Sequence, residues 1–140
     1  MPTPAPTPLR LRPELDELER LTGHIEIFAE EQNLRAKDMY ALTLAVEELF
    51  ANTVNHSQPP ATFVEVTMGI EADGLVSVEY VDDGSAFDPT QQADPDLTLG
   101  TAERQIGGLG VYFIRTSMED FRYARRDGCN VTSFRRRPAA

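Results

Sequence analysis

Residues 42–57, LTLAVEELFANTVNHS, are the stretch on which the predicted fold depends. Apolar residues recur there at steps of three and four, and Pro and Gly are absent, which predicts a helix with one buried face. Glu48, Asn52 and Asn55 fall together on another face, because residues four apart are separated by only about 40° around a helix. No Lys or Arg stands three or four residues from Glu48, so the ion pair typical of a solvated helix is missing. This polar face is therefore either solvated surface or a functional site.

The composition fits one compact domain. A length of 140 residues with 41% hydrophobic content supports a single core. The formal net charge of −10 argues against general binding to nucleic acid or anionic membranes, which attract basic surfaces. The single cysteine, Cys129, excludes an intramolecular disulfide and provides no metal-binding cluster. No apolar run approaches the roughly 18 residues of a membrane span and no signal peptide is recognisable, so a cytoplasmic location is expected.

The organisation expected along the chain is a leader followed by one domain. Residues 1–8, MPTPAPTP, alternate Pro with small residues and predict a disordered, extended leader. Residues 9–137 form the expected domain. It has a short strand at Leu9–Leu11, helices over about 13–32 and 35–56, and strands at 63–71 and 75–81. A long polar connection at 90–105, expected to be a lid, precedes a third helix that reaches Met118 and strands at 121–126 and 131–136.

This order of elements predicts the fold class. Two helices, a hairpin, a lid, a helix and a second hairpin give an α/β (α+β) two-layer sandwich. The expected sheet is mixed, mainly antiparallel, and covered on one face by helices.

Two further motifs contain residues that could bind a ligand. Asp82-Asp83-Gly84 follows a buried-type strand; it is either a simple turn or a site where Asp82 accepts a hydrogen bond from an exocyclic amine such as that of adenine. Gly107, Gly108 and Gly110 stand just before a helix, where backbone N–H groups could approach a phosphate. Each motif by itself has a non-functional reading.

The three motifs in order resemble a known family. Glu48-x-x-x-Asn52 is similar to the N-box of the GHKL (Bergerat-fold) ATPase/kinase superfamily, Asp82-x-Gly84 to its first glycine box, and Gly107-Gly108-Leu109-Gly110 to its second. The segments EELFANTVNHS, DDGSAFDP and GGLGVYFIR most resemble the small RsbW/SpoIIAB-type anti-sigma factors with serine-protein-kinase activity. The resemblance spans about residues 9–137.

The resemblance implies a function and a set of site residues. ATP and Mg²⁺ are the implied cofactors, with Glu48 as the catalytic base or positioning group and Asn52 as the Mg²⁺ ligand. The other residues implied to contact ATP are Asp82, Gly84, Arg104, Gly107, Gly108, Leu109 and Gly110. Arg20 is implied to face a partner protein, and His56 to cap or pack the end of its helix.

The implied partners are those of a partner-switching system. They are a STAS-type antagonist that is phosphorylated on serine, a sequestered sigma factor or similar regulator, and a second copy of the chain in a homodimer. No direct contact with nucleic acid or membrane is expected.

Two departures from the family pattern keep other functions open. Ala86 stands where the first glycine box often has a second Gly, and Gly128-Cys129-Asn130 stands where the last strand typically has Thr just after Gly. Cys129 would be a weaker hydrogen-bond donor near adenine. The alternatives are a non-catalytic nucleotide-binding partner-switching module, or a histidine-kinase-like catalytic domain acting in trans. The sequence lacks the dimerisation and phosphoacceptor helix pair of a sensor kinase, which disfavours the latter.

Overall fold

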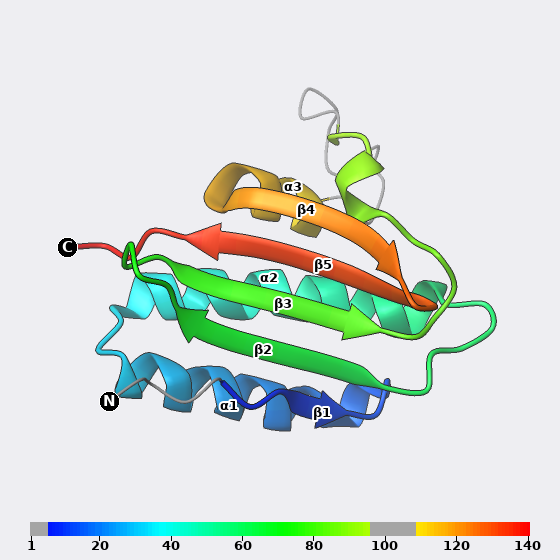
Figure 1. Ribbon diagram of the computed structural model, residues 1–140, viewed down its shortest axis with the longest axis horizontal. Helices are drawn as coiled ribbons and strands as arrows, with labels where there is room; N and C mark the ends of the chain where they lie inside the picture. Colours follow the sequence, from blue (N-terminus) through cyan, green and yellow to red (C-terminus); the bar gives the residue numbers. More distant parts are fainter. Residues whose placement is uncertain (1–5, 96–108) are drawn as a thin grey trace, which may run out of the picture.

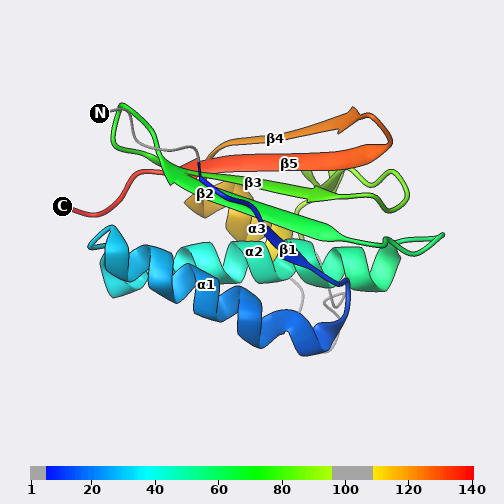
Figure 2. The same cartoon turned by 60° about the horizontal axis from the view of Figure 1, so that its bottom comes forward.

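A sheet and a layer of helices on one of its faces make up the fold (Figures 1 and 2). The computed structural model describes residues 6–95 and 109–140. The strands are β1 (Leu9–Leu11), β2 (Val64–Ile70), β3 (Val76–Asp82), β4 (Glu119–Arg126) and β5 (Cys129–Arg136). The helices are α1 (Leu18–Glu31), α2 (Ala36–His56) and α3 (Leu109–Ser117), with short 3-10 turns η1 (Leu15–Glu17) and η2 (Pro89–Gln91).

The sheet has the order β1-β2-β3-β5-β4. The helices on one face of this sheet confirm the two-layer α/β sandwich. The expectation of a mixed sheet is corrected, because all four pairings between the described strands are antiparallel. The β3–β5 register sets Asp82 opposite Asn130 and Tyr80 opposite Thr132. This register brings residues about fifty positions apart in sequence to one end of the sheet.

The hairpin between β4 and β5 has the turn that its sequence predicts. Asp127 and Gly128 both have positive φ angles, 52° and 76°. Positive φ at both central positions is the geometry of a type I′ turn, which matches the twist of the flanking strands. Only a residue that tolerates this backbone region, such as Gly or Asp, fits there without strain.

Helix α2 is the centre of the helical layer, lying between α1 and α3 (Figures 1 and 2). Its buried residues recur at helical spacing, and Leu42, Val46 and Phe50 have no exposed surface. They pack with valines of β2 and β3 in one core. This burial is the main favourable term for the fold, since each fully buried side chain of this kind contributes about 1.5–3 kcal/mol.

Parts of the predicted organisation lie at or beyond the limits of the described residues. Residues 1–5 of the predicted leader and residues 96–105 of the predicted lid lie outside them, while residues 6–8 carry no helix or strand. β4 begins at Glu119 and β5 at Cys129, each two residues earlier than predicted. None of the described helices has the length and apolar character that a membrane span requires.

The C-terminus is tied to the start of α2 by a buried ion pair. Asp38 is 1% exposed and accepts hydrogen bonds from Arg136 Nε at 2.8 Å and from the Ala139 backbone N–H at 2.9 Å. The Arg136 side chain is itself only 17% exposed. Removing the carboxylate would therefore leave a buried guanidinium without its partner.

We expect Asp38→Ala to lower the free energy of unfolding by about 3 kcal/mol, because breaking a buried pair leaves an uncompensated charge. Urea denaturation followed by circular dichroism measures this loss. Arg137→Ala is the matched control, since the Arg137–Glu119 pair is exposed and 3.9 Å long, and it should change the stability by less than about 0.5 kcal/mol. Equal effects of the two variants would contradict the prediction.

Candidate functional site

A pocket lies between the C-terminal half of α2 and the end of the sheet. The polar residues that line it are Asn52, Thr53, His56, Ser57, Tyr80, Asp82, Asn130 and Thr132, together with the apolar residues Leu49, Phe87 and Pro89. Two residues of the predicted site, Asn52 and Asp82, therefore line the same pocket although they are far apart in sequence. The register of β3 against β5 adds Asn130 and Thr132.

Asp82 is held by three donors and keeps room for one more. It is 5% exposed; its Oδ1 accepts from the Gly84 N–H at 2.8 Å and from Asn130 Nδ2 at 3.0 Å, and its Oδ2 accepts from the Thr53 hydroxyl at 3.2 Å. A carboxylate has about four lone-pair positions. One acceptor position on Oδ2 thus remains for a ligand N–H.

A buried hydroxyl chain supports the Oδ2 side of Asp82. The Tyr80 and Thr53 oxygens are 2.7 Å apart, and Tyr80 is 2% exposed. Burial raises the pKa of Tyr80 well above its usual range, so its hydroxyl keeps its proton. When Tyr80 donates to Thr53, the single Thr53 hydroxyl proton is shared between Asp82 Oδ2 and the Leu49 carbonyl, both at 3.2 Å, so the chain connects Asp82 with the backbone of α2.

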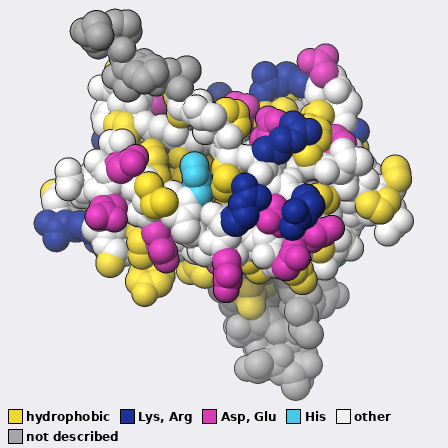
Figure 3. Space-filling view, turned by 90° about the horizontal axis from the view of Figure 1, so that it is seen from below, with side chains coloured by type: hydrophobic (Ala, Val, Ile, Leu, Met, Phe, Trp, Pro, Cys, Tyr) yellow, Lys and Arg dark blue, Asp and Glu magenta, His cyan; other side chains and the backbone are white. Residues whose placement is uncertain are grey.

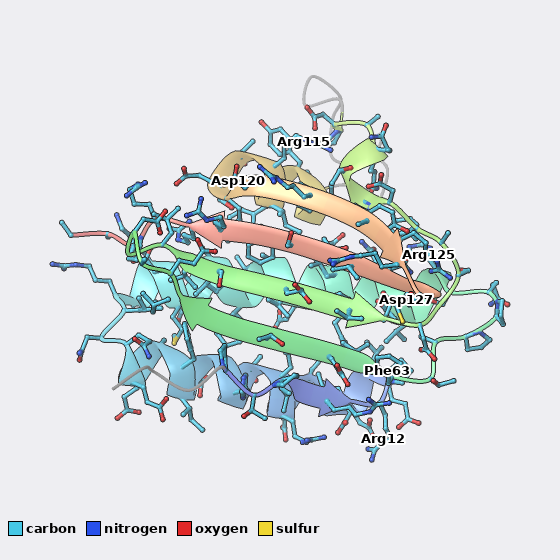
Figure 4. All side chains as sticks on the ribbon, in the orientation of Figure 1. Arg12, Phe63, Arg115, Asp120, Arg125 and Asp127 are labelled. Carbon is cyan, nitrogen blue, oxygen red and sulfur yellow. The ribbon has the colours of Figure 1, made fainter. Side chains whose placement is uncertain are left out.

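Asn130 holds Asp82 and the following loop together. Its Nδ2 donates to Asp82 and to the Ser85 carbonyl at 2.8 Å, and its Oδ1 accepts from the Phe87 N–H at 3.2 Å. Arg125 donates from one nitrogen to Asn130 Oδ1 at 3.0 Å and to the Gly84 carbonyl at 2.8 Å. Figure 4 shows Arg125 at the end of the sheet where this loop leaves β3. Asn130 is 4% exposed, so its contact with Asp82 is buried, whereas Arg125 reaches it from the exposed side of β4.

The two adjacent aspartates have different positions. Asp83 Oδ1 accepts from the backbone N–H groups of Thr62 and Phe63, at 2.6 and 3.1 Å, and its other oxygen accepts from the Thr62 hydroxyl. Asp83 thus fixes the segment that leads into β2. Asp82 alone points into the pocket.

Gly84 is required by a close approach. A Cβ atom at this position would lie 2.3 Å from Ser57 Oγ and 3.0 Å from Asp82 Oδ1. The backbone of the loop after β3 can therefore reach the end of α2 only without a side chain at residue 84. Ala86 needs no such freedom: it is exposed and has no positive φ angle, so Gly is not required at this position.

His56 and Phe87 lie at the mouth of the pocket. Their rings stack with centroids 5.8 Å apart and planes 13° from parallel. His56 is the last residue of α2, and Phe87 lies in the loop after β3. The stack closes one side of the pocket with two flat surfaces.

Glu48 lies outside this pocket, in a neighbouring groove. The groove also contains Glu47, Leu109 and Gly110. A Cβ atom on Gly110 would lie 2.2 Å from Glu48 Oε2, so this glycine lets the carboxylate reach the first turn of α3. Burial raises the pKa of Glu48, while the nearby Asn52 side chain and then His56 oppose that shift. The contact with Asn52 falls short of a hydrogen bond of normal geometry, since Asn52 Nδ2 is buried with no partner among the described residues.

The remaining predicted site residues lie in the groove with Glu48, on α1, or outside the described part of the chain. Arg104, Gly107 and Gly108 lie outside the described residues. Leu109 is 43% exposed and lines the groove with Glu48, not the pocket with Asp82. Arg20 donates to Glu17 at 2.8 Å and to the Arg10 carbonyl at 3.4 Å. Figure 3 shows the face that carries α1 and β1, where basic and acidic side chains are interspersed.

A family model described as a histidine kinase-like ATPase domain matches residues 11–136. This chain belongs to that family. The histidine kinase-like ATPase domain thus covers nearly the whole chain, and ATP is the ligand that membership implies for the pocket.

A curated relative and a solved structure share this domain. The chain is 33% identical over 96 residues to the serine/threonine-protein kinase BtrW of Bordetella bronchiseptica. The matched segment covers 68% of this chain and 68% of BtrW. A crystal structure of the RsbU and RsbW domains of Rv1364c from Mycobacterium tuberculosis superposes with a TM-score of 0.64 at 15% identity. That match covers 99% of this chain and 34% of the other, so the chain spans about a third of that protein. At this identity the likeness supports the fold alone.

The pocket of this histidine kinase-like ATPase domain fits ATP. Asp82 has a free acceptor position for an exocyclic amine, and Gly84 lets the loop after β3 pass close to Ser57, which lines the same pocket. Asn52 has a buried amide nitrogen with no partner among the described residues, which is costly unless a ligand satisfies the group. Each of these features is explained by a bound nucleotide.

The expectation for Cys129 is corrected by the structure. Cys129 is half-buried and pairs with Arg126 at the start of β5, whereas Asn130 contacts Asp82. The error arose because the sequence does not reveal the strand register, and a shift of one residue moves every side chain to the opposite face. Thr53, Tyr80, Thr132 and Arg125 were also missed. Tyr80 and Thr132 meet through the β3–β5 register, Arg125 contacts Asn130 from β4, and Thr53 reaches Asp82 from α2; no local motif marks these residues.

We expect Asn130→Ala to weaken Mg-ATP binding roughly tenfold, since the loss of a buried hydrogen-bonding group costs about 1–3 kcal/mol. The loop after β3 would lose its hold on Asp82. Isothermal titration calorimetry measures the affinity. Cys129→Ala, one residue away, is the matched control and should bind Mg-ATP normally; equal losses in both variants would contradict the role given to Asn130.

Proposed function

We propose that this protein is an ATP-dependent serine-protein kinase of a partner-switching system. In this proposal it phosphorylates a STAS-type antagonist and sequesters a sigma factor or similar regulator in the cytoplasm. The family membership, and the printed name of the relative BtrW as a serine/threonine-protein kinase, support the kinase part. The antagonist, the sigma factor and the choice of serine rest on the resemblance of the three motifs.

The observation that carries the proposal is the division of α2 between two cavities. Asn52 lines the nucleotide pocket, and Glu48, one turn earlier, lines the neighbouring groove. A kinase needs one group that holds the nucleotide and another that meets the acceptor hydroxyl from the opposite side. Successive turns of a single rigid helix hold these two groups at a fixed separation.

Asn52 is the residue that would hold Mg²⁺. Magnesium favours oxygen ligands and usually binds through one or two protein groups together with substrate phosphates. The resemblance to the N-box implies the Asn52 amide oxygen as the protein ligand, and Asn52 lines the pocket with Asp82. With the metal, ATP supplies the phosphoryl group that is transferred.

Glu48 would accept or orient the proton of the serine hydroxyl. Its carboxylate is half-buried beside Gly110 and has no ion-pair partner in residues 6–95 and 109–140. A base with a raised pKa holds a proton more readily than an ordinary glutamate does. Phosphoryl transfer depends mainly on alignment and charge stabilisation, so a single positioned carboxylate can suffice.

The decisive experiment is phosphorylation of a partner protein co-purified with the chain. Wild-type protein with Mg-ATP should produce phosphoserine, and Glu48→Gln should reduce the rate by at least roughly 100-fold, the usual contribution of a general base. Phosphoamino-acid analysis and radiolabel counting measure both. Mg-ATP should still raise the melting temperature of Glu48→Gln, because Asn52 and Asp82 are intact.

Glu26→Gln is the matched control, since Glu26 is an exposed carboxylate on α1 away from both cavities. It should phosphorylate at the wild-type rate. Unchanged phosphorylation in Glu48→Gln would remove Glu48 from its role. Tight partner and nucleotide binding without any phosphate transfer would instead support the non-catalytic module.

The raised pKa of Glu48 makes a separate prediction for stability. A carboxyl whose pKa is higher in the folded state destabilises the fold once the pH is above both its unfolded and its folded pKa. We therefore expect Glu48→Gln to unfold at a higher temperature than wild type at pH 7. The difference should shrink as the pH falls through the folded and then the unfolded pKa. Differential scanning fluorimetry across this range tests it, and a variant less stable than wild type at pH 7 would contradict the burial cost.

A further inference from the structure

An apolar groove runs along the outer side of α2, between the start of α1 and the start of α3. The apolar groove is lined by Leu18, Leu44, Glu47, Glu48, Leu109 and Phe113. Leu44 is 51% exposed and Leu109 is 43% exposed, so two large apolar side chains of this groove have much of their surface uncovered. Helices α1 and α3 lie on opposite sides of α2 (Figures 1 and 2).

The apolar groove is continuous with the proposed chemistry. Glu48 lines this groove and not the nucleotide pocket, and its carboxylate lies against Gly110 at the first turn of α3. A hydroxyl that reaches Glu48 from outside the nucleotide pocket therefore enters through the apolar groove. Leu44 and Leu109 line the same groove, so a chain that carries that hydroxyl meets apolar surface close to Glu48.

The charged side chains in the apolar groove are both acidic. Glu47 and Glu48 are the charged residues that line it, and neither forms an ion pair within the described ranges. Glu47 is turned about 100° from Glu48 around the helix, so it lies at the side of the groove and away from the hydroxyl. A basic side chain is the complementary partner for such a group.

We propose that the apolar groove docks the acceptor segment of the substrate protein, a stretch with a large apolar residue and a Lys or Arg close to the phosphorylated serine. The apolar residue packs between Leu44 and Leu109, and the basic residue meets Glu47. This inference rests on the proposed kinase function and gives its substrate a chemical class. The occupant is a polypeptide of another protein, because the groove contains Glu48, the proposed partner of the acceptor hydroxyl, and the Glu47 carboxylate, unpaired among the described residues, is complementary to a basic side chain.

Binding of synthetic peptides tests the proposal without requiring catalysis. The probe is a fluorescein-labelled peptide with a central serine flanked by one leucine and one lysine, and fluorescence anisotropy measures its affinity for the full chain. Replacing the leucine by aspartate in the peptide, or Leu44 by Asp in the protein, should each weaken binding at least roughly tenfold, as expected for a central apolar contact. Ile27→Ala is the matched control: Ile27 is 59% exposed on α1 and does not line the apolar groove, so binding should be unchanged.

A charge reversal tests the contact with Glu47. Glu47→Lys should bind the lysine peptide about threefold more weakly and a peptide with glutamate in its place about threefold more tightly, the size expected for an exposed pair. If Glu47→Lys binds the glutamate peptide as tightly as the wild type binds the lysine peptide, the contact is assigned to Glu47 and the basic residue of the peptide. A loss that the glutamate peptide does not rescue would overturn the assignment of Glu47.

The outcomes separate this inference from the proposed function. Peptides that bind without discrimination, or bind Leu44→Asp as well as wild type, would overturn the docking site even if Glu48-dependent phosphorylation persists. Selective binding without phosphate transfer would preserve the docking site and contradict the kinase proposal. Size-exclusion chromatography in which the wild type is a dimer and Leu44→Asp a monomer would assign the groove to a second copy and overturn the inference. Mg-ATP should raise the melting temperature of Leu44→Asp as it does for wild type.

Discussion

The burial of one face of α2 against the sheet is the constraint on which the rest of the structure depends. Leu42, Val46 and Phe50 are completely buried in the core shared with β2 and β3. Once that face is fixed, the rotation of every other residue on the helix is fixed too. Asn52 then lines the pocket at the end of the sheet, and Glu48 lines the groove toward α3. Core packing therefore decides the positions of the two polar groups.

The antiparallel pairing of β3 with β5 is the second constraint, because it builds the polar end of the pocket. It sets Asn130 opposite Asp82, and Asn130 then connects that carboxylate with the loop at residues 84–87 and with Arg125. Within this buried network the Asn130 amide donates to Asp82 and to the Ser85 carbonyl and accepts from the Phe87 N–H, while Asp82 keeps one acceptor position open toward the pocket. The family pattern has a threonine just after the glycine, at the position of Cys129, whereas the residue that contacts Asp82 here is Asn130. The asparagine does more, since it also holds the loop.

Much of the fold and part of the candidate site could be predicted from the sequence. Periodicity gave the helices and strands to within a few residues, and the Asp127-Gly128 turn was recognisable from its residue types. Local spacing also related Glu48 to Asn52, because residues four apart share one side of a helix. The sequence could not separate the two into different cavities. That separation depends on where α1, α3 and the sheet end meet α2, which are contacts between distant segments.

What the sequence by itself determined is therefore local: the element types, the buried face of α2, the turn glycines and the motifs that indicate an ATP-binding family. What only the tertiary structure decided is which side chains meet. Asp82 and Asp83 are adjacent and chemically identical, yet one faces the pocket and the other fixes the segment before β2. Cys129 and Asn130 are adjacent too, and only Asn130 contacts Asp82. The physical reason is that neighbouring residues in an extended chain point to opposite sides, and the register that chooses between them is set by pairing with a distant strand.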